Sequence, residues 1–210
     1  MAGKPGGAAL RSIGALFNAG TIGGLTDGRL LERFSAGDDG AEPAFAALVD
    51  RHGPMVLRVC RSLLRDMHDA EDAFQATFLI LAIKARSIRG RDSLSSWLYS
   101  VAYNVAAPSR SSAARRRSHE LKAGQARPTA FEEAPGDDLG PILHEELDRL
   151  PERHRAVLVL CHLEGLTQHQ AAERLGTPVG TVQSRLARGR DRLRARLTRR
   201  GLAPSSAVLA

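Results

Sequence analysis

Large apolar side chains recur at the spacing of α-helices along this chain, but they are almost absent from one stretch, Ser109 to Gly140. That stretch consists mainly of Ser, Ala, Arg, Pro and Gly, and such a segment cannot repay the entropy cost of becoming ordered. Elsewhere almost no run alternates β-branched residues as a β-strand would. The sequence therefore predicts an all-α protein of two small helical domains joined by a flexible linker.

The first of these domains should contain three helices whose apolar faces close one small core. The first helix covers about 44–64 with a break or kink at the Gly53-Pro54 pair, the second covers 69–85, and the third begins near Ser93. The expected segments are an N-terminal extension that is either a short docking helix or disordered (1–25), the first domain (26–117), the linker (118–139), the second domain (140–200) and a frayed tail (201–210).

Basic residues outnumber acidic ones, because 30 Lys and Arg stand against 23 Asp and Glu and give a formal net charge of +7. Such a chain favours a polyanionic partner, either nucleic acid or an anionic membrane surface. The apolar runs fall far short of the roughly 20 residues that span a bilayer, so membrane insertion is not expected. Cys60 and Cys161 lie far apart without any CxxC spacing, which supports neither a disulfide framework nor a zinc finger and is typical of a reducing cytosol.

No pattern of catalytic residues is recognisable in the sequence. The seven histidines show no HExxH or paired-ligand spacing. The glycine-rich segments at 3–7 and 20–24 lack the GxxxxGK pattern of a phosphate-binding loop. We therefore expect no metal site, no cofactor and no enzymatic activity.

The most specific local pattern lies near the C-terminus and has the form of a helix-turn-helix. Thr167 and, three residues later, Gln170 form a capping box at the start of a short helix. Gly176 can take the left-handed conformation that ends this helix. Thr177 would cap the next helix, with Pro178 at its first position. A short helix, a glycine turn and a capped second helix together predict the motif.

The second helix of this motif should have an apolar stripe and a polar face on opposite sides, at about 100° per residue. The stripe holds Val179, Val182, Leu186, Gly189 and Leu193. The opposite face and its flanks present Thr181, Gln183, Ser184, Arg185 and Arg188. Small polar groups and arginines near a helix N-terminus suit base edges and phosphates in the major groove, which favours DNA binding. The alternative is a helical hairpin with a solvated arginine face.

Four segments stand in a distinctive order and spacing: DAEDAFQATFL at 69–79, SWLYSVAYN at 96–104, LPERHR at 150–155 and PVGTVQSRLAR at 178–188. Together they resemble bacterial RNA polymerase sigma factors of the extracytoplasmic-function (ECF) group in the sigma-70 family. The resemblance covers about residues 26–197. It implies that the first domain binds the polymerase clamp and the promoter −10 element, and that the polar face of the second helix in the helix-turn-helix reads the −35 element.

The resemblance assigns one group of residues to docking on the clamp helices of the β′ subunit: Asp69, Glu71, Asp72 and Gln75. These side chains fall on the polar face of the helix expected at 69–85, where an acidic stripe complements a basic helical partner. The alternative is that the acids only help the helix to start through its dipole, a role that Asp69 and Asp72 could fill.

The resemblance also implies that the loop at about 85–93 captures a flipped base of the −10 strand and that Asn104 approaches −10 bases. The arginines expected to contact this DNA are Arg86, Arg89, Arg91, Arg110 and Arg115. Trp97 falls in the apolar stripe and is expected in the core. Pro108 lies inside what is usually a continuous DNA-contacting helix, so we expect this helix to kink or stop near Ala107.

The sequence thus predicts a sigma factor, rather than an enzyme, that acts in the bacterial cytoplasm. Its expected partners are core RNA polymerase, through the β and β′ subunits, and promoter DNA. The alternative is a helix-turn-helix regulator that does not associate with core polymerase. Many relatives also bind an anti-sigma factor, and the sequence does not identify such a partner here.

Overall fold

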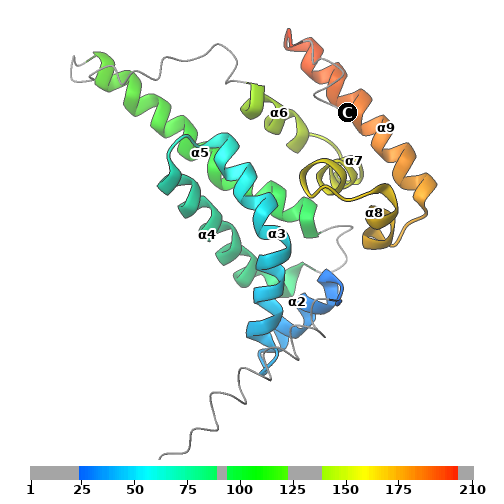
Figure 1. Ribbon diagram of the computed structural model, residues 1–210. Helices are drawn as coiled ribbons and strands as arrows, with labels where there is room; N and C mark the ends of the chain where they lie inside the picture. The colour runs from blue at the N-terminus through cyan, green and yellow to red at the C-terminus, as the bar shows by residue number, and fades with distance from the viewer. Residues whose placement is uncertain (1–23, 89–93, 123–138, 203–210) are drawn as a thin grey trace, which may run out of the picture.

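The computed structural model describes residues 24–88, 94–122 and 139–202 (Figure 1). Throughout these residues the regular structure is helical and no strand occurs, which confirms the all-α prediction. The expected N-terminal extension, the expected linker and the tail lie almost wholly outside the described residues.

The first domain is built, in residues 24–88 and 94–122, from four α-helices and a short 3₁₀ helix. They are α2 (Asp27–Ala36), α3 (Ala41–Leu63), α4 (Met67–Lys84), η1 (Ala85–Ser87) and α5 (Leu94–Lys122). Helices α3, α4 and α5 pack around one core, in which Leu48, Val56, Leu81 and Leu98 are fully buried. Trp97 is only 7% exposed, so its predicted place in the core is confirmed.

Both prolines that were expected to disturb a helix lie inside continuous helices. Helix α3 runs through Pro54, and α5 runs through Pro108 as far as Lys122. Of the two predicted outcomes, a stop of α5 near Ala107 is therefore wrong, and a kink there stays a prediction. A proline removes one backbone hydrogen bond, and here the carbonyl that loses its donor belongs to Asn104, on a part of the helix exposed to water. Helix α5 also extends past the expected domain boundary at residue 117.

The second domain is a set of short helices packed under one long helix. Its elements are α6 (Leu139–Asp148), α7 (Glu152–Leu158), the π-helical turn η2 (Val159–Leu163), α8 (Gln168–Leu175) and α9 (Val179–Arg199). The side chains of Val157, Leu160, Val182 and Leu197 are fully buried and form the centre of its core. The predicted short helix and long helix of the helix-turn-helix are α8 and α9.

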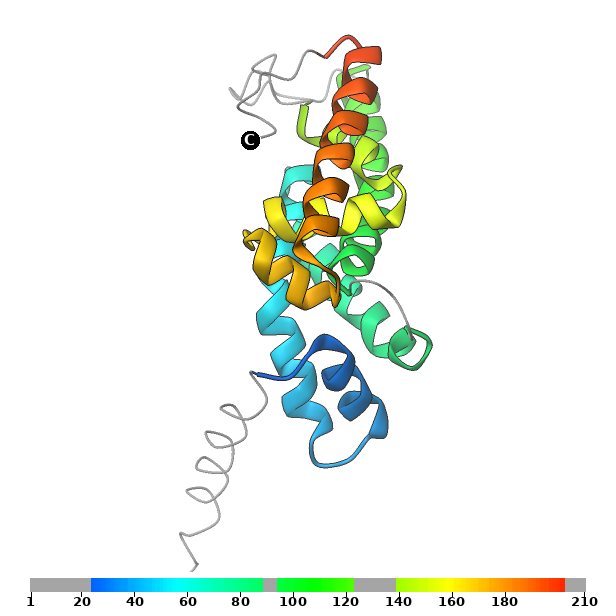
Figure 2. The ribbon, with the colours of Figure 1, turned by 90° about the vertical axis from the view of Figure 1, so that its right-hand side faces the viewer.

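The two domains are in direct contact. Elements α6, α7 and η2 lie against α3 or α5, and buried side chains of both domains form one continuous apolar cluster. Helices α4 and α9 lie on opposite sides of the molecule, with α3, α5 and α7 between them (Figure 1). In the view turned by 90°, α9 comes to the front (Figure 2). The outer faces of α4 and α9 therefore belong to two different surfaces.

Candidate docking and nucleic-acid surfaces

The acidic residues at the start of α4 form an exposed surface. Asp66 caps the helix, because its carboxylate accepts hydrogen bonds from the backbone N–H groups of His68 (2.8 Å) and Asp69 (3.1 Å). Among the four predicted polymerase contacts, Asp69 is half-buried, and the exposed ones are Glu71, Asp72 and Gln75. Asp66 thus fills the capping position, and Asp69 lies in the first turn, where the helix dipole favours an acid.

The helix-turn-helix has most of the local geometry that the sequence predicts. The Thr167 hydroxyl accepts the Gln170 N–H (3.3 Å), and the Gln170 side chain accepts the Thr167 N–H (2.9 Å), so the capping box is confirmed. Gly176 ends α8 with φ 60°. The predicted cap of α9 is wrong: Pro178 takes the N-cap position, and the hydroxyl of Thr177 is buried without a hydrogen-bond partner among the described residues.

Helix α9 presents the two predicted faces. The stripe that faces the core buries Val182, Leu186, Gly189 and Leu193, with Val179 partly buried against the same core. A Cβ atom on Gly189 would lie 3.1 Å from Cδ1 of Leu158, so α9 sits close against α7 here. On the outer side Gln183, Ser184 and Arg188 are exposed, whereas Thr181 and Arg185 are half-buried. The side chains predicted to read DNA thus share one accessible surface.

The arginines at the end of α9 do not form one uniform basic surface. The guanidinium of Arg196 donates to Glu146 at 2.7 Å, and that of Arg200 donates to both carboxylate oxygens of Glu145 at 2.7 and 2.8 Å. Both acids belong to α6, so these arginines hold α6 against α9. The contacts lower the pKa of Glu145, chiefly through its hydrogen bonds with Arg200. The exposed side chains predicted to read DNA lie nearer the start of α9.

The predicted −10 contacts are only partly within the described residues. Arg86 is exposed in η1, where its guanidinium donates to the carbonyl of Ser35 (3.3 Å). Asn104 and Arg110 are exposed on α5. Arg89 and Arg91 lie outside the described residues, and so does the side chain of Arg115. Tyr99, which neighbours this surface in the sequence, is fully buried.

Within residues 24–88, 94–122 and 139–202, no three His, Cys, Asp or Glu side chains gather as a metal site would require. No helix there is long and apolar enough to cross a membrane.

Comparison with known proteins identifies the two domains. Residues 48–116 match the family model described as Sigma-70 region 2, and residues 142–193 match the model described as Sigma-70, region 4. The ECF sigma factor SigM of Mycobacterium tuberculosis is 33% identical over 180 residues, which cover 80% of this chain and 83% of SigM. The ECF sigma-E factor of Haemophilus influenzae is 31% identical over 179 residues, covering 80% and 93%. The chain is an ECF sigma factor.

The chain is also similar to other proteins. The ECF sigma factor SigE of Mycolicibacterium smegmatis is 33% identical over 173 residues, and the match spans 76% of this chain but only 64% of SigE. Among solved structures, CnrH in complex with the cytosolic domain of CnrY is 25% identical, with a TM-score of 0.40, and the match covers 82% of this chain and 97% of CnrH. RpoE of Bartonella quintana, solved with the anti-sigma factor NepR, is 23% identical with a TM-score of 0.33.

The domains of this ECF sigma factor can now be named by their family regions. We call the first domain, whose residues 48–116 match region 2, the region 2 domain, and the second domain, whose residues 142–193 match region 4, the region 4 domain. The protein directs promoter recognition by RNA polymerase through these domains, and it is a transcription initiation factor rather than an enzyme.

The outer face of α4 also carries exposed apolar side chains that were not predicted from the sequence. Leu79 and Ile83 are 62% and 73% exposed on α4, one and two turns beyond Gln75 on the same side of the helix. The spacing of 75, 79 and 83 contains the signal, because it follows an i, i+4 row that excludes the buried side chains of Phe78 and Leu81. The outer face of α4 is therefore acidic at its start and apolar at its end.

Proposed function

We propose that the sigma factor bridges polymerase and promoter with three surfaces. The outer face of α4 docks on the clamp helices of the β′ subunit, the exposed side of α5 with η1 contacts the −10 element, and the outer face of α9 reads the −35 element. The observation that carries this proposal is the placement of α4 and α9 on opposite sides of the molecule (Figure 1).

Charge and exposure support the polymerase contact. Glu71 and Asp72 project from α4 and form no ion pair with another side chain of the described residues. Exposed carboxylates complement a basic partner and speed association with it. The exposed apolar side chains of Leu79 and Ile83 supply surface that becomes buried on docking. A helix with both properties suits a helical partner that is itself basic and partly apolar.

The side chains on α9 support reading of the −35 element in the major groove. Gln183 can form paired hydrogen bonds with adenine, and the guanidinium of Arg188 or Arg185 can do the same with guanine. Ser184 and Thr181 are short enough to let the helix approach the base edges or the phosphates. Arg196 and Arg200 are left out of this surface because α6 holds them.

Three of the residues predicted to contact the −10 element have described side chains: Asn104, Arg86 and Arg110. A side-chain amide such as that of Asn104 can hydrogen-bond the edge of an unstacked base, and the arginines can follow the strand's phosphates. Arg89, Arg91 and Arg115 belong to the same proposal, although their side chains lie outside the described residues. Asp69 joins Glu71, Asp72 and Gln75 in the polymerase contact.

Two further assignments follow from the family. The protein acts in the bacterial cytoplasm, because its partner, RNA polymerase, transcribes the chromosome there. An anti-sigma factor remains a predicted partner, and no surface of this chain is assigned to it. The competing function, a helix-turn-helix regulator without polymerase, would leave the exposed face of α4 without a role.

Charge reversal on α4 tests the polymerase contact. Glu71→Lys with Asp72→Lys should weaken binding to core RNA polymerase at least tenfold in a pull-down at low salt, because like charges would then face each other. Asp39→Lys with Asp50→Lys is the matched control, since it changes the same charge at exposed positions away from α4 and should leave binding within about twofold. Equal binding by both double variants would remove α4 from the interface.

A further inference from the structure

One buried histidine of the region 4 domain is surrounded by cations. His154 lies on α7 and is only 2% exposed. A Cβ atom on Gly189 of α9 would lie 3.5 Å from Cβ of His154, so the two helices are close together here. The charges of three arginines act on the imidazole, those of Arg192 and Arg188 on α9 and that of Arg153 on α7.

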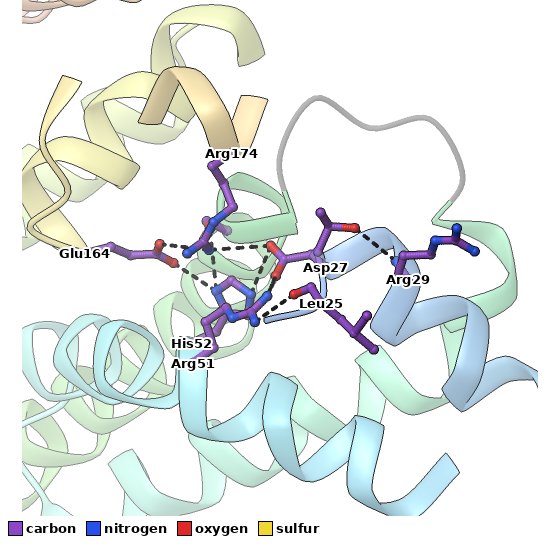
Figure 3. A network of polar contacts seen from close by, with 9 residues as sticks. Leu25, Asp27, Arg29, Arg51, His52, Glu164 and Arg174 are labelled. Atoms are coloured by element: carbon purple, nitrogen blue, oxygen red, sulfur yellow. Dashed lines mark hydrogen bonds and ion pairs between the residues drawn. The ribbon is translucent and has the colours of Figure 1, made fainter. Parts of the chain in front are cut away.

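The other buried histidines of the described residues have different surroundings. His52 lies between the carboxylates of Asp27 and Glu164, which also pair with arginines (Figure 3). His144 makes hydrogen bonds with two hydroxyl groups of the region 2 domain, those of Ser62 (2.7 Å) and Tyr99 (3.1 Å). Only His154 among these three therefore faces several positive charges without a carboxylate beside it.

Both ring nitrogens of His154 have partners. Its Nδ1 lies 3.2 Å from the carbonyl oxygen of Arg185 on α9, and its Nε2 lies 3.4 Å from Nε of Arg153. Because a carbonyl oxygen only accepts, Nδ1 carries the hydrogen, and Nε2 is left to accept the N–H of Arg153. The neutral imidazole thus joins an arginine of α7 to the backbone of α9.

The pKa of His154 agrees with a neutral imidazole. Burial lowers this pKa most, and the hydrogen bond with the carbonyl of Arg185 opposes that effect. The charges of the three arginines lower the pKa as well. A neutral ring can accept a hydrogen bond from a guanidinium without adding a further positive charge to the group.

The three arginines have no acidic partners. Arg153, Arg188 and Arg192 are exposed, and none of them forms an ion pair with another side chain of the described residues. Asp191, the acid next to Arg192, pairs instead with Arg194 at 3.5 Å. At the end of α9 the opposite holds, because α6 supplies acids to the two arginines that hold it. Like charges held together without a counter-charge favour a polyanionic ligand.

These arginines widen the surface that we propose for the −35 element. At about 100° per residue, Arg185, Arg188 and Arg192 lie along one side of α9, and this side meets His154. Arg153 continues the same side onto α7, because His154 ties it to the carbonyl of Arg185. A DNA strand that lies against the outer face of α9 would therefore also pass α7.

Arg153 keeps most of its donors for a ligand. Among the described residues only its Nε is bonded, so the two terminal nitrogens of the guanidinium remain available to phosphate oxygens. A long side chain that is already held in place loses less conformational entropy when it binds. The contact with the imidazole therefore prepares Arg153 for a phosphate.

We propose that Arg153 and Arg192 form a phosphate site at the edge of the −35 surface, and that His154 is the positioning residue that holds Arg153 there. The ligand is the phosphate backbone of one strand of promoter DNA, beside the bases that Arg188 or Arg185 reads. Backbone contacts fix the register of a helix in the major groove, whereas base contacts supply the sequence preference. The inference rests on the proposed −35 contact of α9.

Duplexes with single neutral phosphates test this site directly. Holoenzyme would bind duplexes that carry the −35 element of a promoter it transcribes, with one phosphate at a time replaced by an uncharged methylphosphonate. For wild-type protein, replacement of the phosphate at Arg153 should weaken binding about threefold or more. For Arg153→Ala the same replacement should have no effect, while the other sensitive phosphates stay sensitive. Identical patterns for both proteins would overturn the proposal.

The salt dependence of binding gives a second measure. Arg153→Ala should lower the slope of log affinity against log salt concentration by about 1. It should weaken binding to the −35 duplex and to a scrambled duplex equally, because a backbone contact carries no sequence preference. Arg33→Ala, which removes an exposed arginine from α2, is the matched control and should leave the slope unchanged. An unchanged slope for Arg153→Ala would mean that the arginine is only solvated.

Two substitutions of His154 keep different parts of its contacts. Asparagine can donate to the carbonyl of Arg185 but is too short for Arg153, whereas glutamine places an acceptor near the position of Nε2. His154→Asn should weaken binding about twofold or more, and His154→Gln should largely restore it. In an Arg153→Ala background, His154→Asn should cause no further loss. Circular dichroism checks that each variant is folded, and independent, additive losses would show that His154 does not act through Arg153.

Wild-type holoenzyme separates this proposal from the proposed function. If it prefers the −35 duplex to the scrambled duplex, but Arg153→Ala changes neither the salt slope nor the phosphate pattern, only the phosphate site is rejected. If wild-type holoenzyme shows no preference for the −35 element of any promoter, the proposed function of α9 fails, and the phosphate site falls with it.

Discussion

Gly176 shows how one backbone angle shapes the DNA-binding motif. Its φ of 60° would strain any residue with a Cβ, although no atom lies within 4 Å of where that Cβ would be. Gly176→Ala should therefore lower the free energy of unfolding by about 1–2 kcal/mol, from backbone strain alone. Urea denaturation followed by circular dichroism measures the change.

Gly180→Ala is the matched control for this prediction. Gly180 also has open space around its Cβ position, but it lies inside α9 with an ordinary φ. Alanine there should raise the stability by up to about 1 kcal/mol. The same loss at both positions would show that the left-handed angle of Gly176 is not the cause.

Residue-level features were predictable where they depend on near neighbours in the sequence. The capping box of Thr167 and Gln170 and the left-handed Gly176 follow from residue type and spacing. The cap by Thr177 was predicted wrongly, because Pro178, with φ −58° and ψ 144°, itself occupies the position before the first helical residue. The start of α9 is thereby moved one residue along, and the hydroxyl of Thr177 does not serve as its cap.

At the scale of an element, α9 should divide into a DNA-reading start and a structural end. Arg188→Ala should weaken binding of holoenzyme to a −35 fragment by about 1–3 kcal/mol and relax the preference at one base position. Arg199→Ala, which removes an equally exposed arginine near the end of the helix, should change binding by less than about 1 kcal/mol. Competition binding against single-base variants of the fragment measures both effects. Equal, sequence-independent losses would indicate that both arginines contact only the DNA backbone.

The helices were easier to predict than their interruptions. Buried Ala102, Ala106 and Leu98 hold α5 against the first core, so one missing hydrogen bond at Pro108 does not end it. The propensity of proline is a local signal, and packing overrides it here. The exposed apolar residues Leu79 and Ile83 were missed for a related reason, because hydrophobicity alone suggests burial and only their spacing shows otherwise.

At the scale of the whole molecule, the contact between the domains could not be predicted. It depends on single polar pairs such as His52 with Glu164, which are 112 residues apart and belong to no recognisable pattern. The sequence placed a linker between the domains, and a linker specifies no relative position for them. Polar and charged interfaces of this kind depend on exact geometry, which residue type and spacing do not encode.

Two buried histidines of this contact should make stability depend on pH in opposite directions. Burial lowers the pKa of His144 to about 4. The stability that depends on neutral His144 is therefore fully present above pH 6.5 and is lost as the pH falls toward 4. The pKa of His52 is raised, so its contribution is present below pH 6.5 and is lost as pH rises through the raised value. The free energy of unfolding should therefore be greatest near pH 6.5.

Urea denaturation between pH 4.5 and pH 8.5 measures this dependence. Below pH 6.5 the free energy of unfolding should fall by on the order of 1–3 kcal/mol by pH 4.5. His154 and His162 should contribute less to this fall than His144, and burial lowers their pKa values as well. His144→Asn should flatten the acid side, and His52→Asn should flatten the alkaline side. A variant of His52 that keeps the full alkaline slope would contradict the assignment.

The central claim is that this ECF sigma factor bridges polymerase and promoter, with region 4 on the −35 element and region 2 on the −10 element. Footprinting of one promoter fragment, with permanganate detection of unpaired thymines, tests it most directly. The sigma factor with core polymerase should protect both elements and make thymines of the −10 element reactive, while the sigma factor alone should do neither. Equal protection of the −35 element by the sigma factor alone, with no reactive thymines when polymerase is added, would contradict the claim and favour an ordinary helix-turn-helix regulator.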